Sequence, residues 1–300
     1  MPTFLRYLAI ATALFLFASP LKAEQVTTKL GDLTLNGNLS LADGKSFKDG
    51  VILITHGTLA HGEMDTIKNL QAVLVERGFN TLALNLSLGV SKRVGMYDCK
   101  VPHTHKHTDA LDEIAAWIGW LKSKGTTSIT LFGHSRGGNQ TAWFMAERPD
   151  QAVQSVVLLA PATWNAEKAS KGYAKNHNAP LSKPMGKAKA LVAKGQGKTM
   201  IKGYGFIYCP LTEASAESFL SYYTPDNRFH TPNLLGKIKA PMLVIAGSAD
   251  TVVTGLSEAV GPMAEKSKNL SFTLVDEADH FFLDLFAEDV ADAMEEFFAQ

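Results

Sequence analysis

Short apolar runs and amphipathic stretches alternate along most of this chain. The apolar runs are nearly continuous, as expected for strands that are covered on both faces. They are Val51–Thr55, Thr81–Asn85, Ser128–Phe132, Val156–Ala160, Met242–Ala246 and Ser271–Val275. Strands of this kind predict a mostly parallel sheet.

The stretches between these runs carry apolar residues at three- and four-residue spacing, which predicts helices. The expected helices are Met64–Arg77, Thr108–Lys122, Gly137–Glu147, Leu256–Lys266 and Leu283–Phe298. Residues 26–41 instead alternate apolar and polar, which predicts an antiparallel entry to the sheet, although Asn36-Gly37 is also typical of a turn. Together these elements predict an α/β fold with a doubly wound, mostly parallel sheet.

The alternation stops between residues 162 and 239. This segment has no run comparable to the strands above, and it contains one short helical piece near Lys187–Ala193 and a cluster of aromatic residues. An insertion of this length, after the fourth buried strand, is too long for an ordinary loop. We expect it to form a cap or lid.

The N-terminal residues have the order of a secretory signal peptide. Arg6 precedes the apolar run Tyr7–Ala18, and Leu21-Lys22-Ala23 resembles a cleavage site. The run is shorter than the roughly 20 residues of a membrane helix. We expect a signal peptide over residues 1–23, a mature domain over 24–300 without an integral membrane segment, and export to the periplasm or medium. An uncleaved anchor is the alternative.

Composition excludes some partners. The 300 residues are 46% hydrophobic, enough for one large core, and the formal net charge is zero. No net charge draws the protein toward nucleic acid or an anionic membrane, so we expect a small-molecule partner. Export makes Cys99 and Cys209 a candidate disulfide, although either can equally be a lone buried thiol.

The strongest chemical motif is Gly133-His134-Ser135-Arg136-Gly137-Gly138, between a predicted strand and a predicted helix. A nucleophile elbow needs this context, because small flanking residues let strand and helix approach closely around the serine. A hydroxyl nucleophile needs a base and a group that orients the base. Asp250 and His280 follow two later strands and so reach the same sheet edge, with Asp276, Asp279 and Asp284 as alternative acids.

With these residues the chain resembles the α/β-hydrolase superfamily over all of the mature region except the insertion. The resemblance implies that Ser135 is the nucleophile, His280 the general base and Asp250 the orienting acid. His56-Gly57-Thr58-Leu59 resembles the loop that supplies an oxyanion donor in this superfamily. The expected donors are the backbone N–H groups of Thr58 and Arg136, with Leu59 as the alternative to Thr58.

Histidines gather around this predicted site. His103, His105 and His107 alternate within one segment, which suits a transition-metal site, the mouth of a pocket or simply a polar loop before a helix. We expect no metal or other cofactor, because a serine triad needs none. His56, Leu59, His134, His105 and His107 are candidate lining residues of the pocket, and we expect His56 to support the oxyanion loop by hydrogen bonds and not to act as a second base.

The sequence therefore predicts an exported serine hydrolase that cleaves a carboxylic ester or thioester, with an amide as the alternative, through an acyl-enzyme on Ser135. Two alternatives from other classes stay open: a non-catalytic secreted binding protein with the same fold, and a metal-binding protein or metal-dependent hydrolase that uses the His103–His107 segment. Acyl transfer, perhydrolysis and carbon–carbon bond hydrolysis use the same triad. The sequence decides neither the substrate nor the oligomeric state.

Overall fold

The computed structural model describes residues 23–300. The predicted signal peptide, residues 1–23, lies outside this part of the chain except for its last residue, Ala23. Within the described residues no helix is long and apolar enough to cross a bilayer.

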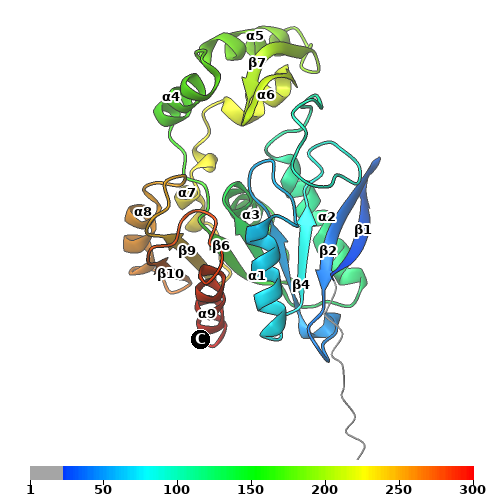
Figure 1. Ribbon diagram of the computed structural model, residues 1–300, viewed down its shortest axis with the longest axis vertical. Coiled ribbons are helices and arrows are strands. Elements are labelled where there is room, and N and C mark those ends of the chain that lie inside the picture. Colours follow the sequence, from blue (N-terminus) through cyan, green and yellow to red (C-terminus); the bar gives the residue numbers. More distant parts are fainter. Residues whose placement is uncertain (1–22) are drawn as a thin grey trace, which may run out of the picture.

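One large sheet organises the molecule, with strand order β1-β2-β4-β3-β5-β6-β9-β10 (Figure 1). Its strands are β1 (Glu24–Leu30), β2 (Leu33–Ser40), β3 (Val51–Thr55), β4 (Thr81–Asn85), β5 (Ile129–His134), β6 (Val153–Leu159), β9 (Met242–Gly247) and β10 (Leu270–Val275). Six strands run parallel to one another, namely β4, β3, β5, β6, β9 and β10. Strands β1 and β2 are antiparallel to their neighbours. The predicted mostly parallel, doubly wound α/β sheet is confirmed.

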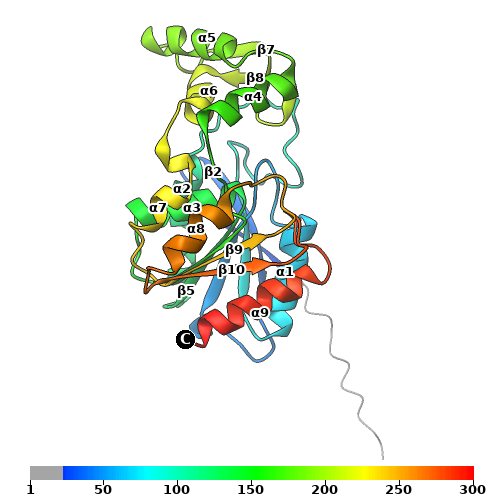
Figure 2. The same cartoon turned by 90° about the vertical axis from the view of Figure 1, so that its left-hand side faces the viewer.

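Helices cover both faces of the sheet (Figure 2). One face packs against α1 (Asp65–Glu76) and α9 (Phe286–Phe298), and the other against α2 (Asp109–Ser123), α3 (Arg136–Glu147) and α8 (Leu256–Ala264). Each predicted helix is present, with ends displaced by less than one turn. A short 3₁₀ turn, η1 (Phe47–Asp49), precedes β3.

Burial on both faces explains why the parallel strands are continuously apolar. Along β3, Val51 and Leu53 belong to one core cluster, whereas Ile52 and Ile54 belong to the cluster on the opposite face. Successive side chains of a strand point to opposite sides, so every position of a doubly covered strand is buried. The predicted antiparallel entry is present as β1 and β2, and Asn36-Gly37 lies inside β2, so the alternative of a turn at that position is wrong.

The segment 162–239 folds over the carboxyl edge of the sheet, where α4, α5, α6 and the β7–β8 hairpin form the upper part of the molecule in Figure 1. Its elements are α4 (Ala166–His177), α5 (Ser182–Ala193), β7 (Met200–Phe206), β8 (Cys209–Ser215), α6 (Ala216–Tyr223), η2 (Asn227–Phe229) and α7 (Pro232–Leu235). We call residues 162–239 the insertion.

The expectation that the insertion has no strand comparable to the others is wrong, because β7 and β8 pair as an antiparallel hairpin. Gly203 and Gly205 interrupt the apolar alternation of β7, so the strand pattern is weak in the sequence. Helix α4 was missed for a similar reason: Tyr173 is its one buried residue. The two elements contact each other, because the Tyr173 hydroxyl donates to the Gly205 carbonyl oxygen at 2.8 Å.

Candidate active site

Ser135 occupies the sharp turn between β5 and α3. Its φ and ψ are 57° and −122°, a combination that residues other than glycine rarely adopt. A Cβ on Gly133 would lie 2.6 Å from the carbonyl oxygen of Gly137, and one on Gly137 would lie 2.3 Å from that of His56. Glycine at these two positions therefore lets the strand and the helix meet, with Ser135 at the carboxyl edge of the sheet.

Ser135, His280 and Asp250 form one hydrogen-bonded chain, although they come from three separate loops. His280 Nε2 lies 2.9 Å from Ser135 Oγ, and His280 Nδ1 lies 2.8 Å from Asp250 Oδ2. In the tautomer that satisfies both bonds, Nδ1–H donates to the carboxylate and Nε2 accepts from the hydroxyl. The loops follow β5, β9 and β10, and parallel strands bring their carboxyl ends to one edge.

Backbone donors hold the Asp250 carboxylate in place. The N–H groups of Val252 and Val253 donate to Asp250 Oδ1 at 2.7 and 2.9 Å. Burial by itself raises the pKa of Asp250, but the hydrogen bonds from His280 and from these N–H groups outweigh burial and leave the pKa below its ordinary value. The group is thus an anion at neutral pH and can stabilise a protonated His280.

Two of the alternative acids, Asp276 and Asp279, have other hydrogen-bond partners. Asp276 accepts a hydrogen bond from the hydroxyl of Ser248 at 2.9 Å, and Asp279 accepts one from the N–H of Phe281 at 2.8 Å. Over residues 23–300, Asp250 is the one carboxylate that is hydrogen-bonded to His280. These contacts favour Asp250 over Asp276, Asp279 and Asp284 as the acid that orients His280.

The loop that follows β3 lies against Ser135. A Cβ on Gly57 would be 3.2 Å from Ser135 Cβ, and Arg136 Nε donates to Thr58 Oγ1 at 2.9 Å. In the described part of the chain, the backbone N–H groups of Thr58, Leu59 and Arg136 have no protein acceptor. Unused N–H groups beside a nucleophile are the geometry that an oxyanion needs, and the contacts leave both Thr58 and Leu59 as candidates for the second donor.

His56 and Arg93 brace this loop. His56 Nδ1–H donates to the carbonyl oxygen of Gly57 at 2.8 Å, and Nε2 accepts from the N–H of Leu86 at 3.0 Å. Burial lowers the pKa of His56 to about 3, so its ring is neutral. Arg93 donates to the carbonyl oxygens of Leu86 and Ala60, each at 2.7 Å, and so ties the loops after β3 and β4 together. Arg93 was not predicted from the sequence, because an arginine in a polar loop is usually a solvated charge.

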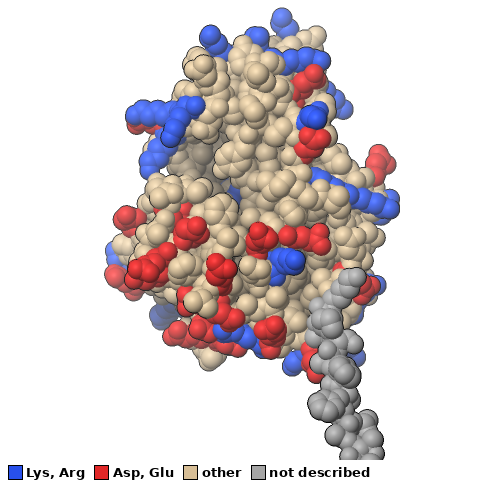
Figure 3. Space-filling model, viewed as in Figure 1, with Lys and Arg blue, Asp and Glu red and all other residues tan. Residues whose placement is uncertain are grey.

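A cavity of about 610 Å³ lies between the insertion and the carboxyl edge of the sheet. Figure 3 shows this region as a hollow between the upper and lower parts of the molecule. Ser135 and His280 do not line the cavity themselves, but their neighbours do: Arg136 follows Ser135, and Ala162 donates its N–H to the Ser135 carbonyl oxygen at 3.0 Å. The cavity thus adjoins the hydrogen-bonded chain and extends into the insertion.

Of the five residues expected to line the pocket, one does so. His107 lines the cavity, whereas His56, Leu59, His134 and His105 are buried elsewhere. His134 Nε2–H donates to the carbonyl oxygen of His280 at 2.9 Å, and the Leu59 side chain packs in the core. Closeness in sequence to Ser135 or to the oxyanion loop does not determine the side-chain direction. Residues that line the cavity but were not predicted include Trp164, Lys168, Tyr173, Tyr222 and His230.

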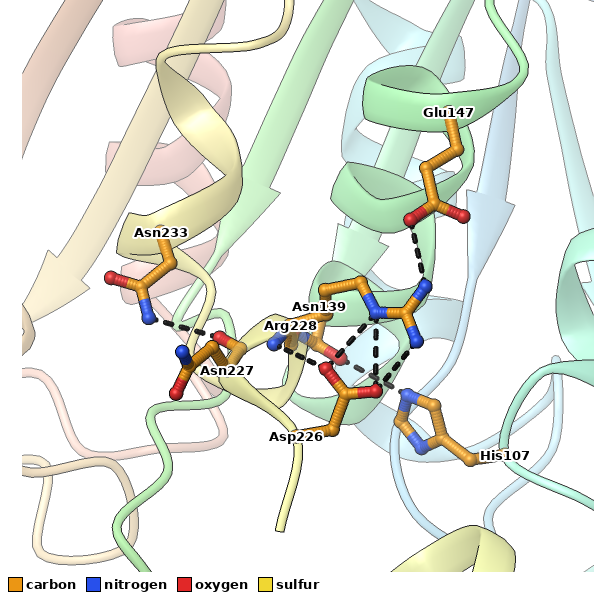
Figure 4. A network of polar contacts seen from close by, with 7 residues as sticks. All are labelled: His107, Asn139, Glu147, Asp226, Asn227, Arg228 and Asn233. Carbon is orange, nitrogen blue, oxygen red and sulfur yellow. Dashed lines mark hydrogen bonds and ion pairs between the residues drawn. The ribbon is translucent and has the colours of Figure 1, made fainter.

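The three alternating histidines bind one another and their neighbours. His103 Nδ1 lies 3.0 Å from His105 Nε2, and His105 Nδ1 lies 2.8 Å from the Tyr222 hydroxyl. His107 Nε2–H donates to Asn139 Oδ1 at 3.0 Å (Figure 4). Burial lowers the pKa of His103 to about 4 and that of His107 to about 3. Across residues 23–300 no three His, Cys, Asp or Glu side chains have a metal-binding arrangement.

This segment instead joins the core to the insertion. The His103 N–H donates to the Glu213 carbonyl oxygen at 2.8 Å, and the Ser215 N–H donates to the His103 carbonyl oxygen at 2.9 Å. Nearby, Cys99 and Cys209 are joined by a disulfide bond. Backbone hydrogen bonds and a covalent bond therefore fix the insertion above Ser135.

Comparison with known proteins agrees with this architecture. Residues 47–200 match the family model described as serine aminopeptidase, S33. Est1E from Butyrivibrio proteoclasticus, in a structure with ferulic acid bound, aligns with a TM-score of 0.64 and 20% identity over 92% of this chain and 100% of that chain.

Two further structures show the same fold. The Pyrococcus furiosus esterase Pf2001 aligns with a TM-score of 0.61 and 19% identity over 93% of this chain and 91% of its own. The α/β hydrolase GrgF from Penicillium sp. sh18 aligns with a TM-score of 0.66 and 14% identity over 92% of this chain and 98% of its own. No protein with a curated description matches the sequence significantly.

Proposed function

The chain belongs to the serine aminopeptidase S33 family of α/β-hydrolases, and on that premise we propose that it is a serine hydrolase that cleaves a carboxylic ester or thioester. The observation that carries the proposal is the hydrogen-bonded chain from Ser135 through His280 to Asp250. We also propose that the insertion acts as a cap over this site and that residues 24–300 form the hydrolase domain.

In the proposed reaction, Ser135 Oγ attacks the carbonyl carbon while His280 Nε2 accepts the hydroxyl proton. The negative charge on the carbonyl oxygen is stabilised by the N–H of Arg136 and by that of Thr58 or Leu59. Protonated His280, stabilised by the Asp250 carboxylate, returns the proton to the leaving alcohol or thiol. His280 then takes a proton from water, the hydroxide attacks the acyl-enzyme, and the acid is released as Ser135 regains its proton.

The cavity favours an ester or thioester over a peptide N-terminus. An aminopeptidase has to hold the α-ammonium group of its substrate, which an acidic side chain does best. The described residues that line this cavity include Arg136 and Lys168 but no Asp or Glu. A cationic substrate group would therefore meet like charges and no counter-ion.

Labelling with a fluorophosphonate probe tests the proposal directly. The purified chain without residues 1–23 is treated with the probe, alongside Ser135→Ala, His280→Ala and the matched acids Asp250→Asn and Asp279→Asn. We expect labelling of the wild type and of Asp279→Asn, none of Ser135→Ala, and strongly slowed labelling of His280→Ala and Asp250→Asn. Absence of labelling in folded wild type would instead support a non-catalytic binding protein.

The same assay with a chelator tests the metal-dependent alternative. Five of the six imidazole nitrogens of His103, His105 and His107 already have hydrogen-bond partners, and His103 Nε2 is the exception. We therefore expect labelling and ester hydrolysis to be unchanged by the chelator. Loss of activity that zinc restores would refute the serine mechanism.

The disulfide supports the further proposal that the protein works outside the cytoplasm, in the periplasm or the medium. Disulfides persist in oxidising compartments and are reduced in the cytosol. Mass spectrometry of the protein recovered from the producing cells tests this. We expect a chain that begins at Glu24 and has lost two hydrogens at Cys99 and Cys209; a full-length, reduced chain would contradict it.

A further inference from the structure

Arg136 directly follows the proposed nucleophile, and its side chain lines the cavity. A guanidinium has five N–H bonds. Two of them are used: Nε donates to Thr58 Oγ1 at 2.9 Å, and Nη1 donates to His107 Nδ1 at 3.3 Å. The central guanidinium carbon of Arg136, Cζ, lies 5.3 Å from the centre of the Tyr222 ring. Every one of these partners is uncharged, because burial and the nearby Arg136 charge lower the pKa of His107 to about 3.

The other arginines of the described chain are all satisfied. Arg77, Arg148 and Arg228 each form an ion pair with at least one carboxylate. Arg93 is buried and donates to carbonyl oxygens instead. Arg136 alone among these five has neither a carboxylate nor enough acceptors. A half-buried guanidinium without a counter-ion is an unfavourable arrangement unless a ligand supplies the anion.

The carboxylate beside His107 is already occupied. Both oxygens of Asp226 accept from the Arg228 guanidinium, at distances of 2.6 to 3.1 Å, and Arg228 also bonds Glu147 (Figure 4). Asp226 is thus hydrogen-bonded to Arg228 and not to Arg136. The charge on Arg136 remains available to the cavity.

A second cation faces the same cavity. Lys168, on α4 of the insertion, donates to Thr254 Oγ1 at 3.0 Å and forms no ion pair within residues 23–300. In Figure 3, Lys and Arg side chains border the hollow on its upper left side. Aromatic rings, including those of Trp164, Tyr173 and Tyr222, supply much of the remaining wall.

We propose that this cavity binds a substrate carboxylate on Arg136, with Lys168 as a second positive group, so that the preferred substrates are esters or thioesters carrying a carboxylate. The inference rests on the proposed function, because it assigns a substrate class to the same site. The planar guanidinium can offer two parallel N–H bonds to the two oxygens of a carboxylate. The site thus excludes cationic substrates and favours anionic ones.

Paired esters that differ only in charge test the inference. The first pair is mono-para-nitrophenyl glutarate and its glutaramate analogue, with the charge on the acyl side. The second pair is the butanoyl ester of meta-hydroxybenzoate and that of meta-hydroxybenzamide, with the charge on the leaving group. The readout is the ratio of kcat/KM between the anionic and the neutral ester, after subtraction of the rate with Ser135→Ala, which removes intramolecular hydrolysis by the glutarate itself.

For one of the two pairs we expect the wild-type ratio of kcat/KM to be about 10 to 100. This is the discrimination that a hydrogen bond to a charged group typically gives. Arg136→Gln should bring this ratio close to one, whereas Arg136→Lys should keep most of it. Both variants retain the backbone N–H of residue 136. A general defect of the oxyanion loop would lower kcat/KM for the anionic and the neutral ester alike, and it would cancel in their ratio. Lys168→Gln should lower the ratio several-fold, and the matched surface change Lys175→Gln on the same helix should leave it unchanged.

The outcomes separate the two proposals. A wild-type ratio near one in both pairs, or an unchanged ratio in Arg136→Gln, overturns the carboxylate site while serine hydrolysis stands. Failure to hydrolyse any of the four esters, together with absence of fluorophosphonate labelling, overturns the proposed function itself. A ratio that falls with added salt in the wild type but not in Arg136→Gln supports the charge-based explanation.

Discussion

Removal of the Cys99–Cys209 bond has a calculable effect on stability. The bond closes a loop with a sequence separation of 110 residues, which contains α2, β5, α3, β6 and most of the insertion. Closing a loop of this length lowers the entropy of the unfolded chain, which is equivalent to about 5 kcal/mol at 25 °C. The double variant Cys99→Ala/Cys209→Ala should therefore lose about 5 kcal/mol of unfolding free energy. That loss is large beside the total of about 5–15 kcal/mol typical of native proteins.

Guanidinium unfolding followed by circular dichroism measures this loss. We expect the midpoint of the double variant to fall by about 1 M, given the steep denaturant dependence of a chain of this size. Reduced wild type should unfold at the same midpoint as the double variant, and reductant should not change the double variant. Equal midpoints for oxidised wild type and the double variant would refute the reasoning. If the midpoint falls in the double variant but not in reduced wild type, the loss of stability comes from lost packing at the buried Cys209 position.

Three further predictions concern the site and its surroundings. Asp250→Asn should lower kcat for an ester about 10³- to 10⁴-fold, because an amide no longer holds His280 in the required tautomer, whereas Asp279→Asn should stay near wild type; a comparable loss in both would contradict the assignment. Arg93→Met should lower the unfolding free energy by about 3–5 kcal/mol in denaturant titrations, because it leaves buried carbonyl oxygens without donors, and a loss below about 1 kcal/mol would be inconsistent with the network. Stability should rise with pH from about 4 to about 6.5, since buried histidines have depressed pKa values in the folded state and the unfolded chain therefore binds more protons below pH 6.5. Burial raises the pKa of Glu113 to about 7 and also raises the pKa of Asp109, and both carboxyls act in the opposite direction. They are two groups against five, so a flat melting temperature over this range would refute the argument. The histidines concerned are His56, His103, His105, His107 and His134.

The sheet and its helices follow from local patterns in the sequence. The strands buried on both faces are largely apolar, and the helices that cover the sheet have an apolar stripe, so both signals can be recognised without any tertiary information. The motif around Ser135 could be identified for a related reason: its glycines are required by the tight strand–helix turn itself. The positions of Asp250 and His280 then followed from the rule that parallel strands end at one edge.

The elements of the insertion and the residues of the pocket wall could not be predicted from local sequence patterns. Strand β7 has a weak alternation, and helix α4 is mostly polar with one buried residue. The insertion that contains them is held by contacts with segments far away in the sequence, such as the disulfide to Cys99. Side-chain direction is equally non-local. His134 is adjacent to Ser135 and yet bonds the His280 backbone, whereas Lys168 reaches the cavity from the insertion.

Arg136 illustrates the division between the two kinds of information. The sequence alone determined that this residue follows the nucleophile, because the strand–turn–helix pattern needs no distant contact. Only the tertiary structure decided that its guanidinium meets a neutral His107 and a cavity wall without a carboxylate, since those neighbours come from other loops and from the insertion. Short-range sequence patterns determine the local backbone geometry, whereas the charge balance of a site depends on which distant segments fold against it.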